Sequence, residues 1–270
     1  MNKYSTIIQW CGRFGNNIQQ ISNAIYFCEK NKLNFVCPEN DMIHSFNINF
    51  GEYYCMPNFF FFHVNSETNQ GPAHFICNLE DIRINRRRIC LNYIRENLKI
   101  NTTNIKKTDD NTVIIHIRGG DIFSRDNYYC PVVSRYIQNP LKYYLDIIEK
   151  FENVLILTED YLNPVVSELE KLDNVKVSIC SIVETIETLL SAKNVVTSGV
   201  SSFPIACLLL SDNIENIYCS DLHLNEIISY KDFVDEKVNI HITNIDLQRY
   251  INYNEWLNTP DQKKLMIKYI

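Results

Sequence analysis

The sequence predicts an α/β protein built around parallel β-sheets. Short runs of apolar and β-branched residues alternate with segments of helical length and helical apolar spacing, and proline or glycine marks many of the boundaries between them. Because parallel strands need a long crossover connection that is usually a helix, this alternation favours parallel pairing. The alternation becomes regular from Thr112 onward, so we expect two domains, residues 1–110 and 111–270.

The first domain opens with the pattern of a strand, a glycine turn and a helix. Tyr4–Trp10 is a β-type run, and Gly12 and Gly15 punctuate the turn that follows. The helix is indicated by apolar residues at helical spacing, namely Ile18, Ile21, Ile25 and Cys28. Leu33–Cys37 is the expected second strand, which makes a βαβ crossover. The stretch Asp41–Asn111 has too little periodicity to define its elements.

The second domain is expected to alternate strands and helices to its end. The expected strands are Val113–Ile117, Val154–Thr158, Val175–Ser178, Val195–Thr197 and, as the last one, Ile217–Cys219. Two helices should begin at an Asn cap followed by Pro, at Asn139–Pro140 and Asn163–Pro164. Further helices are expected over Ile182–Ala192, Pro204–Leu210 and Pro260–Ile270, the last with a capping box of Thr259 and Gln262. Ligands bind such sheets at the carboxyl ends of the strands.

The charge and cysteine patterns exclude several function classes. The formal net charge of -6 gives no basic surface, so we expect no nucleic-acid partner. The basic run Arg86–Arg88 lies among isoleucines, which favours a solvated strand or helix edge. The 10 cysteines include no CxxC pair and no His at ligand spacing, so we expect no metal site and a reducing, cytoplasmic location. No apolar stretch is long enough to cross a bilayer, so we expect no transmembrane segment.

The segment Val113–Asp121 carries the strongest signal for a ligand site. Because side chains alternate along a strand, His116 and Arg118 should share one face, and Gly119–Gly120 lets the backbone approach a ligand closely. An arginine there can hold a diphosphate by two parallel hydrogen bonds and neutralise the charge of a leaving phosphate. The alternative is that His116 is a core histidine and that Arg118 pairs with Asp121 as a turn clamp.

Two further turns can bind anions at a helix start. Gly12–Asn17 opens the first helix, and Thr197–Pro204 lies between a strand and a helix, so both offer free backbone N–H groups. The alternatives are an ordinary βα turn, in which Asn16 caps the helix, and a serine cap with no ligand. Thr158–Asp160 ends another strand at the same expected sheet edge, where its carboxylates can receive a base or a ribose.

Taken together, these segments resemble the fucosyltransferase superfamily that includes the α1,2-, α1,6- and protein O-fucosyltransferases. The resemblance rests on Gly12–Asn16, His116–Asp121, Thr158–Asp160 and Ser201–Phe203, which occur in the family's order and roughly its spacing. Asn139–Tyr144 also resembles the helix that follows the arginine motif in α1,2-type members. The chain departs from the α1,2-type pattern at two positions, with Gly119 where a second Arg is usual and Asn17 where a Gln is usual.

The resemblance implies a GT-B-like fold of two Rossmann-type domains, with the acceptor on the N-terminal side and the nucleotide sugar on the C-terminal domain. It implies an inverting transfer of fucose from GDP-fucose to a glycan hydroxyl, with no cofactor and no essential metal ion. The alternatives are a glycosyltransferase that uses another nucleotide sugar, and a non-catalytic glycan- or nucleotide-binding module. The acceptor, the linkage and the oligomeric state are not encoded in any pattern we recognise.

The resemblance also assigns roles to residues. Arg118 would grip the β-phosphate, His116 would support the donor, and Asn16 would lie at the acceptor end. With Asp121 these form the expected catalytic set, and the candidates for the general base are Asp121, Asp126 and Asn16. Ser201, Ser202 and Phe203 would hold phosphates and nucleotide, and Glu159 or Asp160 the guanine or ribose. The expected donor-binding set is therefore Arg13, Gly15, Glu159, Asp160, Ser201, Ser202 and Phe203.

Overall fold

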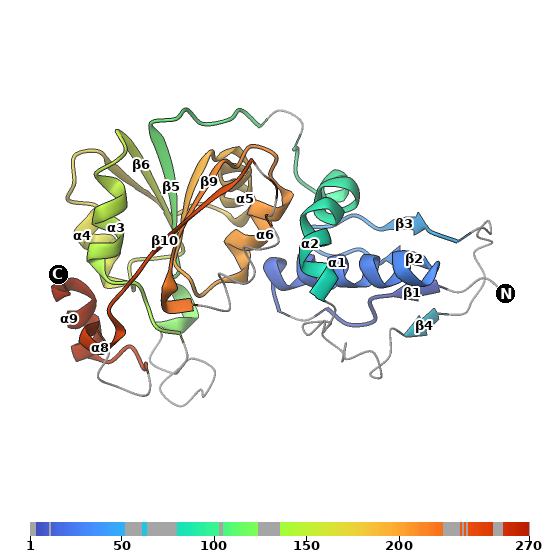
Figure 1. The fold of residues 1–270 in the computed structure, drawn as a ribbon, viewed down its shortest axis with the longest axis horizontal. Coiled ribbons are helices and arrows are strands. Elements are labelled where there is room, and N and C mark those ends of the chain that lie inside the picture. The colour runs from blue at the N-terminus through green and yellow to red at the C-terminus, as the bar shows by residue number, and fades with distance from the viewer. Residues whose placement is uncertain are drawn as a thin grey trace. The chain divides into compact units, whose positions relative to one another are not determined.

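The computed structural model describes residues 4–10, 12–51, 61–63, 80–102, 105–123, 136–223, 233, 235, 237–250 and 256–269. The chain divides into two compact units, both of α/β type (Figure 1). Unit 1 comprises Met1–Ile105, Ser202–Asp212 and Lys231–Val234, and unit 2 comprises Lys106–Ser201, Asn213–Tyr230 and Asp235–Ile270. The sequence pattern assigned everything after residue 110 to the second domain, whereas Ser202–Asp212 belongs to unit 1.

Unit 1 contains a four-stranded sheet in the order β3-β2-β1-β4. The strands are β1 (Tyr4–Thr6), β2 (Asn34–Cys37), β3 (Phe46–Asn49) and β4 (Phe61–His63). β1 pairs in parallel with β2 and β4, and α1 (Phe14–Asn31) packs on β1 and β2, so the predicted βαβ crossover is confirmed (Figure 1). β3 is antiparallel to β2, because no helix crosses between these two strands, and the expectation of a purely parallel sheet is therefore wrong in unit 1.

The other helices of unit 1 pack together with α1. α2 (Glu80–Ile89) continues through a π-helical turn, η2 (Cys90–Ile94), and a 3₁₀ turn, η3 (Arg95–Asn97). α6 (Ser202–Leu210) contacts both α1 and α2. α6 thus packs with the helices of unit 1, although it follows a strand of the other unit, Asn194–Thr197, in the sequence.

The expected solvated edge at the basic run of α2 is wrong for two of its three arginines. Arg86 and Arg87 are buried. The Nη2 of Arg86 donates to the Oδ1 of Asn23 at 3.3 Å, and the Nη1 of Arg87 donates to the backbone carbonyl of Leu208 at 3.3 Å. The guanidinium of Arg87 also lies 5.3 Å from the ring centre of Phe233. Both arginines therefore serve packing inside unit 1, where each guanidinium has a polar partner on α1 or α6.

Unit 2 contains a six-stranded parallel sheet in the order β10-β9-β8-β5-β6-β7. The strands are β5 (Thr112–Ile117), β6 (Asn153–Thr158), β7 (Val175–Ser178), β8 (Asn194–Thr197), β9 (Asn216–Ser220) and β10 (Asn239–Thr243). The chain runs outward from β5 to β7, returns to β8 on the other side of β5, and runs outward again to β10. This is a Rossmann-like strand order. The prediction that the strand around Ile217 is the last one was wrong, because β10 follows it.

The helices of unit 2 are α3 (Leu141–Ile148), α4 (Pro164–Leu169), α5 (Ile182–Ser191), α8 (Leu247–Tyr250) and α9 (Pro260–Lys268). Asn163 caps α4 as predicted, since its Oδ1 accepts from the backbone N–H of Val165 at 3.2 Å. The predicted capping box of α9 is also confirmed. The predicted cap of α3 is wrong, because the N-cap residue is Pro140. The Oδ1 of the buried Asn139 instead accepts from the Oγ of Ser220 at 2.6 Å. Asn139 therefore binds a residue of strand β9 and not the first turn of the helix.

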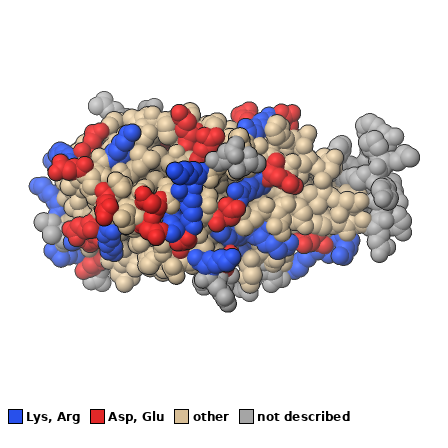
Figure 2. Space-filling view, turned by 90° about the horizontal axis from the view of Figure 1, so that it is seen from above, with Lys and Arg blue, Asp and Glu red and all other residues tan. Residues whose placement is uncertain are grey.

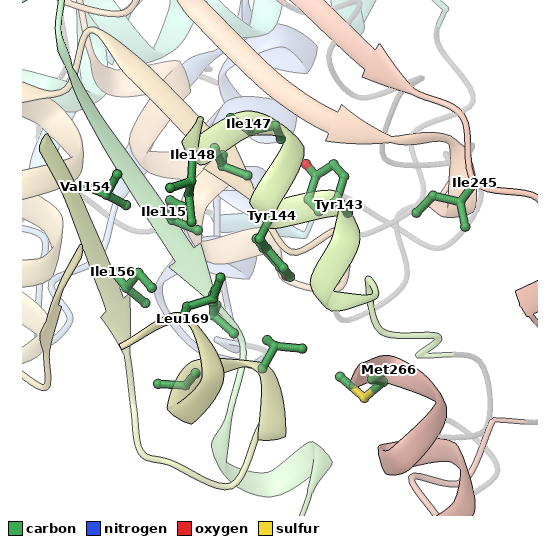
Figure 3. Close-up of a cluster of buried hydrophobic side chains, with 14 of the residues drawn as sticks. Ile115, Tyr143, Tyr144, Ile147, Ile148, Val154, Ile156, Leu169, Ile245 and Met266 are labelled. Atoms are coloured by element: carbon green, nitrogen blue, oxygen red, sulfur yellow. The ribbon is translucent and has the colours of Figure 1, made fainter. Parts of the chain in front are cut away.

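The core of unit 2 lies between the central strands and the helices α3, α4 and α9. Val113, Ile115 and Ile117 of β5 are fully buried in this cluster, and the intervening side chains of the strand face the other side of the sheet. Figure 3 shows side chains of α3 packed toward those of β5 and β6, among them Tyr143, Tyr144, Ile147, Ile148, Ile115, Val154 and Ile156. This packing fixes the position of β5, and the residues that follow its carboxyl end belong to the candidate site.

Surface charges of both signs are interspersed on the face of the molecule drawn in Figure 2, where basic side chains lie beside acidic ones over the described residues. Among the described residues, none of the helices combines the length and the apolar character that crossing a bilayer requires. The described cysteines are free thiols, and all but Cys180 are buried. Burial raises the pKa of the Cys28 and Cys37 thiols to about 12, so these groups behave as small apolar side chains.

Candidate functional site

The carboxyl ends of three central strands lie side by side in unit 2. β5 pairs in parallel with β6, in register Ile117 to Thr158, and with β8, in register His116 to Thr197. The chain leaves β5 toward β6 on one side and returns to β8 on the other, so the connections diverge between β5 and β8. This divergence is a topological switch point, where open α/β sheets bind ligands. The residues predicted at 118–121, 158–160 and 198–201 therefore meet at one edge of the sheet.

Arg118 lies at this edge and forms ion pairs with two carboxylates. Its Nη1 donates to the Oε1 of Glu159 at 2.7 Å, and its Nη2 donates to the Oδ1 of Asp121. The Arg118 side chain is 12% exposed, whereas those of Glu159 and Asp121 are 41% and 66% exposed. The guanidinium thus points toward the end of β6, and the turn clamp with Asp121 that the sequence left open is present.

Two glycines allow the ends of β5 and β6 to approach each other. A Cβ at Gly119 would lie 2.6 Å from the Oδ1 of Asp160, and a Cβ at Gly120 would lie 2.5 Å from the Oε2 of Glu159. Gly120 also has a φ of 62°, which favours glycine. Any side chain in place of Gly119 would therefore require Asp160 to move.

Asp160 holds the backbone around this turn. Its Oδ2 accepts from the N–H of Gly120 at 3.0 Å, and its Oδ1 accepts from the N–H of Leu162 at 2.8 Å. The sequence assigned Asp160 to the guanine or ribose side of a donor. Both of its carboxylate oxygens contact protein backbone, so the contacts in the structure favour Glu159 of the two for a ligand.

His116 is buried on β5, two residues before Arg118. Burial first, and the positive charge of Arg118 second, lower the pKa of His116 from the ordinary 6.5 to about 4. The imidazole is therefore neutral at pH 7. It can donate or accept a hydrogen bond there, but it adds no positive charge that would hold a phosphate.

The loop after β8 contributes hydroxyl groups to the same edge. Ser198 is fully buried, and its Oγ has no hydrogen-bond partner among the described residues. Gly199 follows with a φ of 80°, and the partly exposed Ser201 ends the part of the loop that belongs to unit 2. The sequence placed both serines in an anion-binding turn and named Ser201 as a site residue; the structure shows that Ser198 is buried and that Ser201 is the one of the two with an accessible side chain.

The second group of predicted residues lies in unit 1, at the start of α1. Arg13 is the N-cap residue, and its carbonyl accepts from the backbone N–H groups of Asn16 at 2.9 Å and Asn17 at 3.1 Å. Asn16 therefore does not cap the helix, which was one of the two alternatives. Its Oδ1 instead accepts from the Oγ of Ser202, at the start of α6, at 2.8 Å.

The starts of α1 and α6 are in direct contact within unit 1. A Cβ at Gly15 would lie 2.5 Å from the backbone carbonyl carbon of Ser202, so only glycine fits there without a shift. The rings of Phe14 and Phe203 pack with their centres 5.8 Å apart. Two motifs separated by most of the chain thus form one cluster, which brings together four of the predicted residues: Gly15, Asn16, Ser202 and Phe203.

The predicted residues thus form one group at the sheet edge of unit 2 and another in unit 1. Asp126, a candidate for the general base, lies outside the described residues. Within the described ranges, no cluster of three or more His, Cys, Asp and Glu side chains has the arrangement of a metal site. The comparisons found no family model that matches the chain, no curated protein similar in sequence and no solved structure similar in fold.

Proposed function

We propose that the protein is an inverting, metal-independent glycosyltransferase with a GT-B-like arrangement, which transfers fucose from GDP-fucose to a glycan hydroxyl. The observation that carries the proposal is the position of Arg118. Arg118 directly follows β5, one of the two strands that flank the switch point of a Rossmann-like sheet, and its guanidinium pairs with Glu159 at the end of β6. A single cation at that position is suited to a nucleotide diphosphate.

In the proposed reaction an acceptor oxygen attacks the anomeric carbon of fucose. The new bond forms on the opposite face as the bond from that carbon to the β-phosphate oxygen breaks, and GDP takes the electron pair. The acceptor proton passes to a base. Arg118 stabilises the charge that grows on the leaving diphosphate, which is the role that donors aimed at a developing charge perform in enzymes.

The ion pairs of Arg118 are compatible with this role. A guanidinium has five N–H donors, and the pairs with Glu159 and Asp121 need only one each on Nη1 and Nη2. Two carboxylates around one cation nevertheless repel a diphosphate. Because both carboxylates are well exposed, either can rotate into water when a phosphate takes its place.

The remaining residues have supporting roles in the proposal. The hydroxyl of Ser201 donates to a phosphate oxygen, and neutral His116 supports the donor. Among the candidates for the general base, Asn16 carries an amide, which is not basic, so Asp121 is the candidate carboxylate among the described residues.

One observation favours a different function. The carboxylates of Glu159 and Asp121 outnumber the charge of Arg118, which weakens the attraction for a diphosphate. Of the two kinds of non-catalytic module, a glycan-binding one holds no diphosphate and tolerates this arrangement, whereas a nucleotide-binding one meets the same repulsion. A glycosyltransferase for another nucleotide sugar keeps Arg118 and differs only in base or sugar recognition.

A panel of nucleotide sugars tests the proposal. The protein with EDTA is incubated with GDP-fucose, GDP-mannose, UDP-glucose and UDP-galactose, and thermal unfolding and release of the nucleoside diphosphate are measured. A donor at a hundred times its Kd stabilises the folded state by about 2.7 kcal/mol. We expect GDP-fucose to give the largest rise in Tm, with slow release of GDP as water takes the place of the glycan hydroxyl and accepts the fucose. A larger response to another donor would reassign the substrate, and binding without release would favour the non-catalytic module.

A further inference from the structure

The turn that follows Arg118 is held by side chains from separate parts of unit 2. The backbone carbonyl of Arg118 accepts from the Nδ2 of Asn163, the cap of α4, at 3.1 Å. The N–H of Gly120 donates to Asp160 at 3.0 Å, as described above. The 3₁₀ turn η4 (Gly120–Ile122) is then closed by the N–H of Phe123, which donates to the carbonyl of Gly120 at 3.0 Å.

A third contact comes from the C-terminal segment. The Nδ2 of Asn258 donates to the backbone carbonyl of Ile122 at 2.6 Å, in a buried hydrogen bond across 136 residues of sequence. Asn258 is 7% exposed and has a φ of 53°, a conformation that asparagine adopts more readily than most residues. This contact fixes the far end of the turn whose near end is fixed by Asn163.

The orientation of the Asn258 amide is determined by Trp256. The indole Nε1 of Trp256 donates to the Oδ1 of Asn258 at 2.6 Å, and the Trp256 side chain is fully buried. Since an indole N–H can only donate, the oxygen of the amide must face Trp256 and the NH₂ group must face Ile122. The donor to the turn is thus preset by a second buried group.

The segment that carries Asn258 is itself firmly anchored. The side chain of Gln262 accepts from the backbone N–H groups of Leu257 at 2.9 Å and Thr259 at 3.1 Å, and the capping box of α9 adds a reciprocal bond from Gln262 to Thr259. These bonds place Asn258 between a buried tryptophan and a capped helix. The segment can therefore act as a rigid support for the turn.

We propose that Asn258 is a positioning residue, which acts through the carbonyl of Ile122 to hold the turn that places Arg118 for a nucleotide diphosphate. The claim that Asn258 positions the turn depends only on the hydrogen bonds described. The claim that this affects nucleotide binding rests on the proposed function. A residue far along the chain from the arginine motif thereby joins the candidate site, and no local motif marks it.

Two matched variants test this inference. Asn258→Asp keeps the shape of the side chain and the acceptor for Trp256, but it replaces the donor to Ile122 with an oxygen that repels the carbonyl. Thr259→Ala, one residue away, removes only the bond from the N–H of Gln262 to the Thr259 hydroxyl; the backbone bonds of Leu257 and Thr259 to Gln262, and the bond of Asn258 to Ile122, stay in place. Amide hydrogen exchange at Gly120 and Phe123 is compared with exchange at Glu184 in the cap of α5, and the Kd for GDP is measured by calorimetry.

We expect Asn258→Asp to speed exchange at Gly120 and Phe123 by about tenfold more than at Glu184, and to raise the Kd for GDP by a similar factor. Thr259→Ala should change exchange at all three amides alike. If the two variants give the same exchange pattern, the inference is overturned. If the aspartate variant does not fold, Asn258→Gly can replace it, because glycine adopts the positive φ without steric strain. It should also speed exchange at Gly120 and Phe123 more than at Glu184. A parent protein that does not bind GDP contradicts the proposed function, while the exchange comparison still decides the positioning role.

Discussion

Replacing Arg118 by alanine is expected to lower the rate of fucose transfer by about a hundred- to a thousandfold, the usual cost of removing a donor aimed at a developing charge. The fold should persist. The partners of Arg118, Glu159 and Asp121, are 41% and 66% exposed, so water can solvate them when the cation is removed. The measurement is kcat and KM for GDP-fucose in the parent and the variant, with circular dichroism to verify folding.

Arg88→Ala is the matched control for this prediction. Arg88 of α2 also forms an ion pair, donating from Nη2 to the Oε2 of Glu29 at 2.7 Å, but it lies in unit 1 and is not a candidate site residue. We expect the kcat of the Arg88→Ala variant to stay within a few-fold of the parent value. If Arg118→Ala also stays in that range, Arg118 is a turn clamp and the proposed role in catalysis is wrong.

Acidification is expected to destabilise the protein by about 3 kcal/mol through His116 alone. The pKa of His116 is lowered from 6.5 to about 4 in the folded state, by burial and then by the charge of Arg118. Between these values the unfolded chain binds a proton that the folded protein does not bind. The stability present above pH 6.5 is therefore lost as the pH falls, and the loss is complete near pH 4.

The variant His116→Gln isolates this effect. Urea unfolding is measured for both proteins between pH 7 and pH 4. The pKa of His241 is also lowered, by burial and by Lys150, but His241 is present in both proteins and cancels in the comparison. We expect the stability of the parent to fall more steeply than that of the variant. Parallel curves would mean that His116 is already protonated, or accessible to water, in the folded protein.

The regular elements of unit 2 could be predicted from local patterns because their strands are buried. β5 and β8 are buried runs rich in β-branched residues, and Asn163-Pro164 and Thr259-Pro260 are caps whose partners lie a few residues away. β10 could not be recognised in the same way. It is an edge strand with polar residues at alternate positions and mostly exposed side chains, so it lacks the apolar run of a buried strand.

Other features depend on tertiary partners that no local pattern contains. Asn139 precedes a proline as a helix cap does, yet its amide binds Ser220 of another strand. Arg86 and Arg87 form a charged run, yet α1 and α6 bury them. The assignment of α6 to unit 1 follows from packing between segments far apart in the sequence.

The candidate site was predicted in part. The sequence indicated that the ends of β5, β6 and β8 share an edge, and the strand order confirms this. It did not indicate that Asp160 would be bound to Gly120, or that Asn16 would bind Ser202, because each bond depends on a close approach that glycine permits. The roles of these residues toward a donor remain predictions of the resemblance.

A crystal structure of the protein with GDP tests the central claim most directly. The account predicts that the Arg118 guanidinium leaves Glu159 or Asp121 and binds the β-phosphate, with the diphosphate beside the loop that starts at Ser198. A nucleotide bound elsewhere, with both ion pairs of Arg118 intact, would contradict the account.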